Sequence, residues 1–238
     1  MTAPMDELLM VAGSWGLHLD QRQIEQFARY SAELRAWNTR VNLTAITDER
    51  EIVIRHFLDS LRCALSWGEH PLRLIDVGSG AGFPALPLKI LAPELHITLV
   101  ESVGKKAAFL RHIVATLDLR DVAVVNARAE VVGRDPRHRE QYDVVTARAV
   151  AELAILAEYC LPLCAIGGRV LAPKGSDVDD EAARARVAIA RLGGQLLSVE
   201  PVDIPGVEPR TLVVIAKIAP TPAAYPRAVG VPVKRPLR

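Results

Sequence analysis

This sequence has few cysteines, no long apolar run and almost no net charge. Its 238 residues include three cysteines, too few for a disulfide framework, which is typical of a reducing compartment. No apolar run reaches the roughly 18 residues that a membrane-spanning helix needs. The first residues include Asp6 and Glu7, where a signal peptide would carry positive charge. We therefore expect a cytoplasmic protein that does not enter a membrane.

The cysteines also give little support for a metal site. Cys160 and Cys164 are four residues apart in an apolar stretch that reads as a helix, and no second pair accompanies them. Structural zinc sites use four ligands. We therefore expect both thiols to be buried in helix packing, and we predict no metal ion.

The formal net charge of +1 shows that the chain lacks the broadly basic composition of many nucleic-acid-binding proteins. The charge is uneven, however, because residues 219–238 contain five prolines and four cations but no acid. Such a segment buries too little apolar surface to order itself. We expect this Pro-rich basic tail to be either a solvated terminus or a loose basic arm that contacts phosphate.

From residue 72 onward, short β-rich runs alternate with helical runs. This alternation predicts right-handed βαβ units and a parallel sheet covered on both faces. The last two runs are joined by IPGVEP, which is too short for a helix, so they should form an antiparallel hairpin. The expected strands are 73–77, 96–101, 122–127, 142–147, 168–173, 195–203 and 210–218, and the expected helices between them are 83–92, 104–117, 151–164 and 177–192. By analogy of fold, this α/β pattern predicts the Rossmann-like, mostly parallel sheet of a class I methyltransferase with a C-terminal antiparallel hairpin.

The first 70 residues read as helices. Apolar side chains fall at helical spacings in residues 5–16 and 20–39, Asp20 is a suitable N-cap, and a further helix is expected near 49–66. We expect an N-terminal helical region at 1–70, packed on a methyltransferase domain at 71–218 and followed by the tail at 219–238.

A glycine-rich loop, DVGSGAG, follows the first expected strand. In open α/β sheets the ligand lies beyond the carboxyl ends of the strands, so this loop is the natural cradle. Gly78 and Gly80 can supply unusual φ values, and Gly82 can bring the next helix close. A nicotinamide-type GxGxxG needs glycine where Phe83 stands, a nucleophile elbow needs glycine where Val77 stands, and no GxxxxGK[ST] motif is present. The remaining pattern fits S-adenosylmethionine.

Two further features support that cofactor. Glu101 closes the second strand, 23 residues after Gly78, where a carboxylate can accept both ribose hydroxyl protons. Its alternative role is an acidic helix cap before Gly104. The segment Asn126 to Glu130 follows the third strand, where an adenine ring would lie. These features and the glycine loop follow successive strand ends along one edge of the sheet.

The methyl acceptor has to be inferred largely from absent motifs. The [DN]PP[YF] motif used for exocyclic amino groups is missing, since the fourth strand ends in TARAVAE with Arg148. Carbon-5 methylation of pyrimidines needs a cysteine nucleophile in a Pro-Cys setting, and no cysteine follows a proline. Guanine N7 carries a lone pair and no proton, so positioning alone can accelerate its methylation.

Several short motifs in this sequence resemble those of one protein family. They are Asn42-Leu43-Thr44, Arg55-His56-Phe57-Leu58-Asp59-Ser60, Asp76 to Pro84, Leu110-Arg111, Arg128-Ala129-Glu130, Ala147-Arg148-Ala149, Lys174-Gly175 and Arg210 to Ile215. Their order and spacing over residues 20 to 218 resemble the bacterial 16S ribosomal RNA guanine-N7 methyltransferase family, also called glucose-inhibited division protein B. The glycine loop is shared with many methyltransferases, whereas the other motifs are more specific. The tail lies outside this resemblance.

The resemblance implies a function and a set of site residues. It implies methyl transfer from S-adenosylmethionine to N7 of one guanine in small-subunit ribosomal RNA, by a protein that we expect to be monomeric and to need no acid or base. The implied cofactor residues are Gly78, Phe83, Ala129, Glu130 and Arg148, to which the loop pattern adds Gly80 and the strand-end pattern adds Glu101. The implied acceptor-side residues are Asn42, His56, Asp59, Arg128, Arg148, Lys174 and Arg210.

Each acceptor-side residue also has a simpler interpretation. Asn42 and Thr44 can cap the turn before the third helix, and His56, Asp59 and Ser60 can form a solvated cluster on one helix face. In the same way, Arg128 can pair with Glu130 on the surface, and Lys174 and Arg210 can face solvent at strand ends.

Other functions remain open at this stage. A small-molecule methyltransferase on the same fold would not depend on RNA, but it leaves the NLT and RHFLDS segments without a role. A ribosome-assembly factor with a cofactor pocket and no catalysis would bind ribosomes even after cofactor binding is destroyed. A nicotinamide oxidoreductase is the weakest alternative because of Phe83.

Overall fold

The computed structural model describes residues 3–68, 72–176 and 178–238. Its centre is a seven-stranded sheet with the order β3-β2-β1-β4-β5-β7-β6. Strands β1 to β5 are parallel, and β7 is antiparallel to both β5 and β6. The strands are β1 (Arg73–Val77), β2 (His96–Val100), β3 (Val122–Val125), β4 (Tyr142–Thr146), β5 (Cys164–Lys174), β6 (Gly194–Val202) and β7 (Arg210–Lys217). The predicted mostly parallel sheet with a C-terminal antiparallel hairpin is therefore confirmed.

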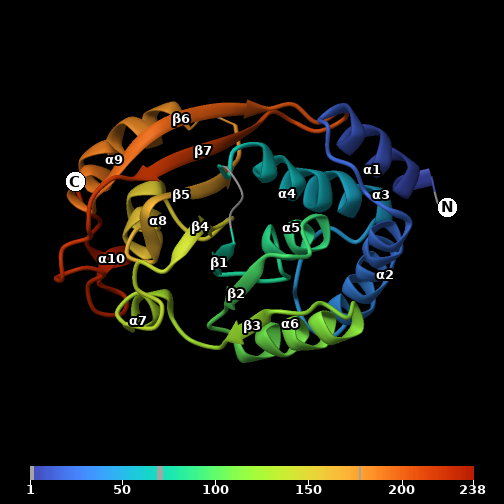
Figure 1. The fold of residues 1–238 in the computed structure, drawn as a ribbon, viewed down its shortest axis with the longest axis horizontal. Coiled ribbons are helices and arrows are strands. Elements are labelled where there is room, and N and C mark those ends of the chain that lie inside the picture. The colour runs from blue at the N-terminus through green and yellow to red at the C-terminus, as the bar shows by residue number, and fades with distance from the viewer. Residues whose placement is uncertain (1–2, 69–71, 177) are drawn as a thin grey trace.

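Helices cover both faces of the sheet, and each face has its own hydrophobic core (Figure 1). Successive strand residues face opposite cores: Leu74 packs with the N-terminal helices, and Ile75 packs with α8 and α9. The described helices are α1 (Ala3–Ser14), α2 (Gln21–Asn38), α3 (Glu49–Ile52), α4 (Asp59–Leu61), α5 (Ala85–Leu91), α6 (Gly104–Thr116), α7 (Ala129–Val132), α8 (Leu153–Cys160), α9 (Asp179–Arg191) and α10 (Val231–Lys234).

The N-terminal helices lie against the same core as α5 and α6. Asp20 caps α2 as predicted, since it accepts from the Gln23 amide at 2.8 Å while the Gln23 side chain accepts from the Asp20 amide. The expected helix at 49–66 is one run of four parts, because a π-helical turn (Val53–Leu58) separates α3 from α4 and a 3-10 turn (Arg62–Leu65) ends the run. The π-helical turn was not predicted, and turns of this kind are frequent at functional sites.

The predicted boundary between α8 and β5 is wrong. Cys160 ends α8, but Cys164 already begins β5, so only one of the two thiols lies in a helix. Both are fully buried, as expected. An irregularity in the pairing of β4 with β5 between Tyr142 and Val144 accommodates the extra residues at the start of β5.

The C-terminal segment, residues 219–238, also differs from the prediction. It is neither a solvated terminus nor a loose arm: it packs beside α7 and α8 (Figure 1), and Thr221, Pro226, Pro232 and Leu237 are buried. The composition argument failed because the ordering partners, including Arg139 and Glu158, lie more than 60 residues earlier in the chain.

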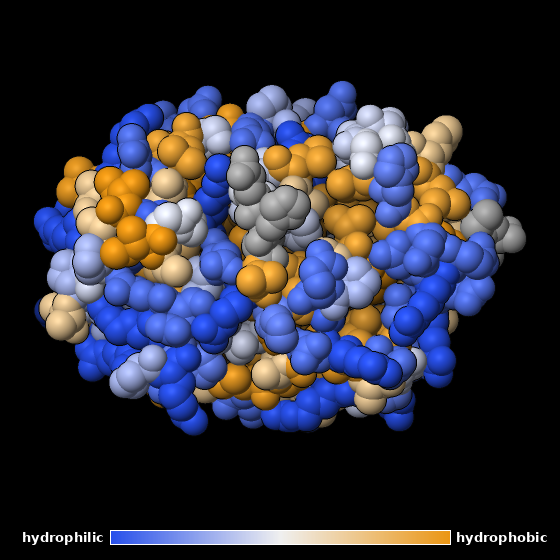
Figure 2. All heavy atoms as spheres, in the orientation of Figure 1, coloured by the Kyte–Doolittle hydropathy of each residue, from blue (hydrophilic) through white to orange (hydrophobic). Residues whose placement is uncertain are grey.

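The surface of the molecule is mixed in character. Figure 2 shows hydrophilic side chains over much of one face, with apolar side chains in several patches between them, some on the side where Figure 1 places the N-terminal helices and some on the opposite side. Within the described ranges, no helix has the length and apolar character to cross a membrane. No group of three or more histidine, cysteine, aspartate or glutamate side chains in those ranges could hold a metal ion.

Candidate active site

The glycine loop follows β1 and is held against the end of β2. The amides of Gly78 and Ser79 both donate to the Val100 carbonyl, at 2.8 and 3.0 Å. Gly78 has a φ of +70° and Gly80 a φ of +56°, in the region that favours glycine. An added Cβ at Gly78 would lie 2.8 Å from Val150 Cγ2, so packing of Val150 excludes a side chain there, whereas an added Cβ at Gly80 would meet only the Gly78 carbonyl oxygen at 3.8 Å, so the loop backbone is open at Gly80.

Close packing against α2 and α5 leaves no space for a side chain at Gly82. Its φ is +95°, and an added Cβ would lie 2.5 Å from Leu86 Cδ1 and 2.6 Å from Tyr30 Oη. The Tyr30 hydroxyl donates to the Ala81 carbonyl at 2.5 Å. The close approach that we predicted for Gly82 therefore involves α2 as well as α5.

Glu101 ties the loop to the end of β2. Its carboxylate accepts from the Gly80 amide at 2.9 Å and from the Val103 amide at 2.7 Å. The contact to Val103 fixes the residue before α6 but does not cap the helix, which has no side-chain cap, and the contact to Gly80 adds a link to the cradle. Each carboxylate oxygen has a further lone pair, so Glu101 keeps acceptor capacity for hydroxyl groups.

Asp76 provides an independent sign that a polar ligand belongs here. Its Oδ1 accepts from Thr146 Oγ1 at 2.7 Å, but its buried Oδ2 has no partner among the described residues. Burial raises the pKa of this carboxyl to about 7. A buried acceptor without a donor is costly unless water or a ligand supplies one. The bare glycine cradle, Glu101 and this acceptor together fit a cofactor with hydroxyl groups and a cationic amino-acid end.

A cavity of about 90 Å³ lies beside this cradle. It is lined by Val77, Gly78, Val100, Ser102, Ala127, Arg128, Ala129, Glu130, Val150 and Tyr159. Ala129 and Glu130 begin the short helix α7, and Glu130 is 5% exposed. Arg128 is exposed and lines this cavity, so it lies on the cofactor side and apart from the other residues expected at the acceptor. No ion pair between Arg128 and Glu130 is found in the described chain.

Arg148 is the centre of a second cluster. Its Nη1 donates to Asp59 Oδ2 at 2.9 Å and to the Arg55 carbonyl at 3.1 Å, and its Nη2 lies 2.9 Å from His56 Nδ1. Its guanidinium carbon lies 5.0 Å from the centre of the Phe83 ring. Phe83 in turn stacks on His56 at 4.5 Å between ring centres. The residue after the glycine loop therefore touches the acceptor-side cluster directly.

His56 is held as a neutral imidazole. A guanidinium donates and never accepts, so the contact with Arg148 assigns Nδ1 as the unprotonated nitrogen, and Nε2 carries the proton toward Thr44 Oγ1 at 2.8 Å. The 3.1 Å approach of Nδ1 to the Arg55 carbonyl is then a contact without a hydrogen bond. Burial, together with the charges of Arg148 and Arg210, lowers the pKa of His56 to about 3. With its one basic nitrogen bound to Arg148, His56 is poorly suited to act as a general base.

The cluster opens into a cavity of about 280 Å³ lined by cations. Its lining residues are Arg55, His56, Arg148, Ala149, Pro173, Lys174, Gly175 and Arg210. Asp59 is 3% exposed and pairs with both Arg148 and, at 3.7 Å, Arg210. The expectation of a solvated polar cluster at His56, Asp59 and Ser60 is therefore wrong, because all three side chains are buried.

The other expected acceptor-side residues have mixed positions. Lys174 is not solvent-facing, because its ammonium donates to Glu181 at 2.7 Å and to the Ala151 carbonyl at 2.8 Å. Asn42 is exposed. The turn around it is held by Asn38, whose Oδ1 accepts from the Leu43 and Thr44 amides, and the following helix is capped by Asp48. The capping interpretation is thus not supported for Asn42, whereas Thr44 does bind the turn, since its hydroxyl accepts from the Ile46 amide at 3.1 Å.

Sequence reasoning assigned no role to several residues of this region. Tyr30 lies on the apolar face of α2, and only its hydroxyl distinguishes it from a core residue. Ala149 has a φ of +57°, a conformation that non-glycine residues hold at a cost and often near functional sites. Asp76 did carry a visible signal, because it is an acid in the otherwise apolar run LIDV.

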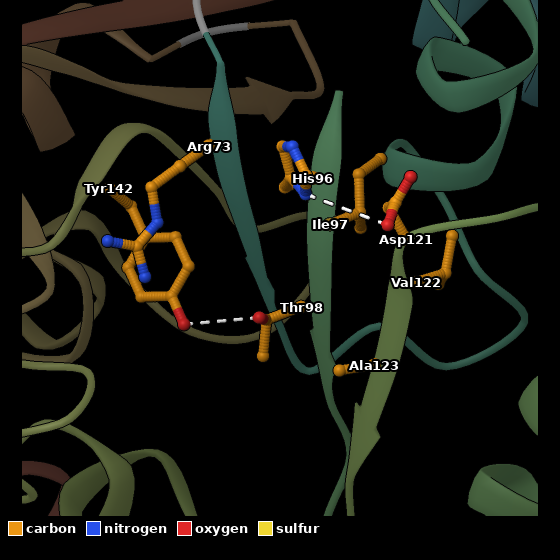
Figure 3. Close-up of a pocket in the computed structure, with 8 residues that line it drawn as sticks. All are labelled: Arg73, His96, Ile97, Thr98, Asp121, Val122, Ala123 and Tyr142. Atoms are coloured by element: carbon orange, nitrogen blue, oxygen red, sulfur yellow. Dashed lines mark hydrogen bonds and ion pairs between the residues drawn. The ribbon is translucent and has the colours of Figure 1, made fainter. Parts of the chain in front are cut away.

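A cavity of about 600 Å³ lies elsewhere on the sheet (Figure 3). Arg73, His96, Val122 and Tyr142, which line it, are the first residues of their strands, so this cavity is at the opposite end from the glycine loop. Its polar groups largely pair with one another: Tyr142 donates to Thr98 at 3.1 Å, and His96 lies 3.9 Å from Asp121. Since ligands of open α/β sheets bind beyond the carboxyl ends of the strands, we do not assign the cofactor to it.

Solved structures with a similar fold include a protein in complex with AdoMet and several methyltransferases. The chain matches M. jannaschii TYW2 in complex with AdoMet with a TM-score of 0.52 and 16% identity, covering 66% of this chain and 73% of that chain. It matches the antibiotic-resistance methyltransferase Kmr with a TM-score of 0.50 and 18% identity, covering 67% and 93%. At these identities the likeness shows the fold alone, which is the class I methyltransferase fold.

Sequence comparisons identify the family. Residues 23–208 match the family model described as "GidB: rRNA small subunit methyltransferase G". The chain is 83% identical over 233 residues to the ribosomal RNA small subunit methyltransferase G of Roseiflexus castenholzii, covering 98% of this chain and 100% of that protein. It is 57% identical over 238 residues to the protein of the same name from Chloroflexus aggregans, covering all of both chains. The chain therefore belongs to the rRNA small subunit methyltransferase G family.

Proposed function

We propose that this protein transfers the methyl group of S-adenosylmethionine to N7 of a guanine in small-subunit ribosomal RNA. The observation that carries the proposal is the contact between two sites: Phe83 of the cofactor loop packs against His56 and Arg148, which line a cation-rich cavity. A base bound in that cavity and a cofactor on the loop would be neighbours. Family membership supports the substrate class, since the matching relatives are named for ribosomal RNA of the small subunit.

The cofactor would be held by this chain's backbone and acids. The backbone of Gly80 is open and Gly78 lines the adjacent cavity, Glu101 would offer acceptors for the ribose hydroxyls, and the Ala129–Glu130 wall would face the adenine. The bound cofactor supplies an electrophilic methyl group on a positively charged sulfur. The unpartnered Oδ2 of Asp76 is an acceptor for the amino-acid end, directly or through water.

Guanine N7 suits the chemistry of the cavity. Its lone pair would accept the methyl group directly, and the positive charge of the donor would pass to the methylated base as the bond from carbon to sulfur is lost. No proton leaves N7, so no base is needed, in agreement with the neutral and occupied imidazole of His56. Rate enhancement then comes from positioning the two reactants.

The cations around the cavity would hold the RNA. Arg55, Arg210 and Arg148 come from three different parts of the chain and meet at this one opening. Contacts of Arg and Lys with phosphate fix the register of a nucleic acid, and a base splayed from a single-stranded loop can enter a pocket. This arrangement works without a broadly basic surface, which the net charge of +1 does not provide.

The direct test uses labelled S-adenosylmethionine and small subunits from a strain that lacks the gene. After reaction, the RNA is digested and its nucleosides are separated. We expect label in 7-methylguanosine. Label in another nucleoside would overturn the acceptor, and measurable cofactor binding without label in RNA would favour the small-molecule or assembly-factor alternatives.

Arg148 gives a sharper variant test of the same proposal. Arg148→Lys keeps the charge beside Asp59 but loses the fork that reaches Asp59 and His56 together. We expect a fall in methyl transfer of about 10²-fold, as for a misplaced positioning group. Arg186→Ala, which removes an exposed arginine on α9, is the matched control and should keep normal activity. Equal activity of both variants would contradict the role of Arg148.

A further inference from the structure

The C-terminal segment, residues 219–238, is anchored to the domain by a buried ion pair. Lys217 at the end of β7 is fully buried, and its ammonium lies 3.0 Å from Glu140 Oε1 and donates to the Leu161 carbonyl at 2.9 Å. The same Glu140 oxygen accepts from the Thr221 amide at 2.7 Å. The segment therefore leaves β7 in a fixed direction.

Two arginines then hold the backbone of the segment. Arg139 donates to the carbonyls of Thr221 and Tyr225, at 2.7 and 2.8 Å. Arg134 donates to the Pro226 carbonyl at 2.7 Å. Both arginines lie in the connection between α7 and β4, so the segment runs beneath the helix that carries Ala129 and Glu130.

Arg227 forms the next contact, with an acid that is otherwise buried. Glu158 on α8 is 0% exposed, and the Arg227 guanidinium pairs with both of its oxygens, at 2.9 Å for Nε to Oε1 and 2.6 Å for Nη2 to Oε2. The Arg227 amide also donates to Oε1 at 2.8 Å. The residue after Glu158 is Tyr159, which lines the cofactor-side cavity.

Gly230 reaches the cavity wall itself. Its amide donates to Glu130 Oε1 at 2.9 Å, and Glu130 lines the cavity with Gly78 and Tyr159. Burial, followed by the charges of Glu130 and Glu158, raises the pKa of Tyr159 to about 12, so its hydroxyl stays protonated beside these two acids. The segment thus contacts Glu130 of the cavity wall directly and, through Glu158, holds the turn of α8 that carries Tyr159.

From these contacts we propose that residues 227–238 position the cofactor pocket, with Arg227 and the Gly230 backbone fixing Glu130 and Tyr159 for binding the adenosine part of S-adenosylmethionine. The inference rests on the proposed cofactor site. It assigns a role to a stretch that the family model, which ends at residue 208, does not reach. It also replaces the expected role of a phosphate-binding arm, because the segment's contacts run inward to the cavity wall.

The test measures cofactor affinity separately from RNA affinity. The chain is ended after Pro226, which removes Arg227 and Gly230 but keeps the contacts of Arg134 and Arg139. We expect the Kd for S-adenosylmethionine and for S-adenosylhomocysteine to rise at least about tenfold, and the KM for ribosomal RNA to stay within about twofold. Calorimetric titration at a temperature where circular dichroism shows the shortened chain to be folded gives the two Kd values. Unchanged Kd values in the folded, shortened chain would overturn the proposal.

Point variants keep the test decisive if the shortened chain does not fold. Arg227→Lys retains a cation beside Glu158 and Arg227→Ala does not, so the cofactor Kd should increase from wild type to Lys to Ala. Arg235→Ala, which removes an exposed cation of the same segment, is the matched control and should bind cofactor normally. A rise in the KM for RNA with Arg235→Ala, without any change in cofactor Kd for the Arg227 variants, would instead establish the basic-arm role.

Failure of the proposal for residues 227–238 can be distinguished from failure of the proposed methyl transfer. If the unaltered protein binds S-adenosylmethionine but forms no 7-methylguanosine, the proposed reaction fails while the Kd comparison still decides the role of the segment. If the unaltered protein binds no S-adenosylmethionine, both proposals are overturned.

Discussion

At the scale of single residues, Asp76 combines full burial with incomplete hydrogen bonding. It is 0% exposed at the end of β1, with Thr146 on one oxygen and no described partner on the other. A carboxylate in such a place is poorly solvated, which is why its pKa rises from 3.8 to about 7. This carboxyl therefore lowers the stability of the folded protein at neutral pH.

This placement predicts a pH-dependent stability. Between pH 3.8 and about 7, Asp76 is protonated in the folded protein and ionised in the unfolded chain. The folded state binds more protons, so the contribution of Asp76 to the free energy of unfolding falls as the pH rises, by at most about 1.4 kcal/mol per pH unit. Asp76→Asn removes this pH-dependent contribution to the free energy of unfolding, because asparagine does not titrate. Urea unfolding should thus show the variant gaining stability relative to wild type from pH 5 to 7 and then no further change.

The difference between the two proteins isolates Asp76 from other titrating groups. His56, whose pKa is lowered to about 3, acts in the opposite direction, because the unfolded chain takes up its proton as the pH falls below 6.5. That contribution is common to both proteins and cancels. A stability difference that stays constant from pH 5 to 8 would contradict the buried, unpartnered carboxyl.

At the scale of elements, α2 and α5 meet at the glycine loop and leave no space for a side chain at Gly82. Gly82→Ala would force a Cβ to within 2.6 Å of Tyr30 Oη, at a φ of +95°. We expect this change to lower the free energy of unfolding by roughly 2–5 kcal/mol, from crowding and left-handed backbone strain together. Chemical denaturation would measure it.

Gly13 offers the matched control for that substitution. It lies inside α1, and an added Cβ would meet nothing within 4 Å. Gly13→Ala should stabilise the protein by about 0.5–1 kcal/mol through helix propensity. If the two substitutions had similar effects, the close packing of α2 on the loop would be wrong.

Periodicity predicted most elements but not their long-range partners. The alternation of strands and helices, the cap at Asp20 and the positive φ of Gly78 are local features, and the structure confirms them. The order of residues 219–238 depends on Glu158 and Arg139, which bind it across 69 and 82 residues and which no local pattern indicates. The position of Glu101 directly after β2 was predictable from the strand pattern, whereas the bonds of Glu101 to Gly80 and of Tyr30 to Ala81 join distant parts of the chain and were not predicted.

At the scale of the whole molecule, the N-terminal helices and the sheet share one core. Phe27, Tyr30 and Phe57 from the helical region pack in the same cluster as Phe83 and Phe109. Ring centres of Phe27 and Phe57 are 4.9 Å apart, and those of Tyr30 and Phe83 are 5.3 Å apart. Because the two regions share this core, we expect residues 1–70 to fold and unfold together with residues 71–218.

The distribution of tryptophan makes this testable in the unmodified chain. All three tryptophans, Trp15, Trp37 and Trp67, lie within residues 1–70. Tryptophan fluorescence consequently reports on the helical region, whereas far-ultraviolet circular dichroism reports on the whole molecule. We expect both signals to change at the same denaturant concentration, as a single cooperative transition requires. Fluorescence changing well before circular dichroism would instead mean a separate N-terminal domain.

The substitution Phe57→Ala tests whether the helical region and the methyltransferase domain share one core. Phe57 is 0% exposed, and its loss should cost about 3–5 kcal/mol through lost burial and the cavity left behind. Because the core is common to both regions, the fluorescence and circular dichroism midpoints should fall together and by equal amounts. A fall confined to fluorescence would show that the helices are stabilised only among themselves. Cofactor affinity should then survive that partial unfolding, whereas a shared core predicts that it is lost in the same transition.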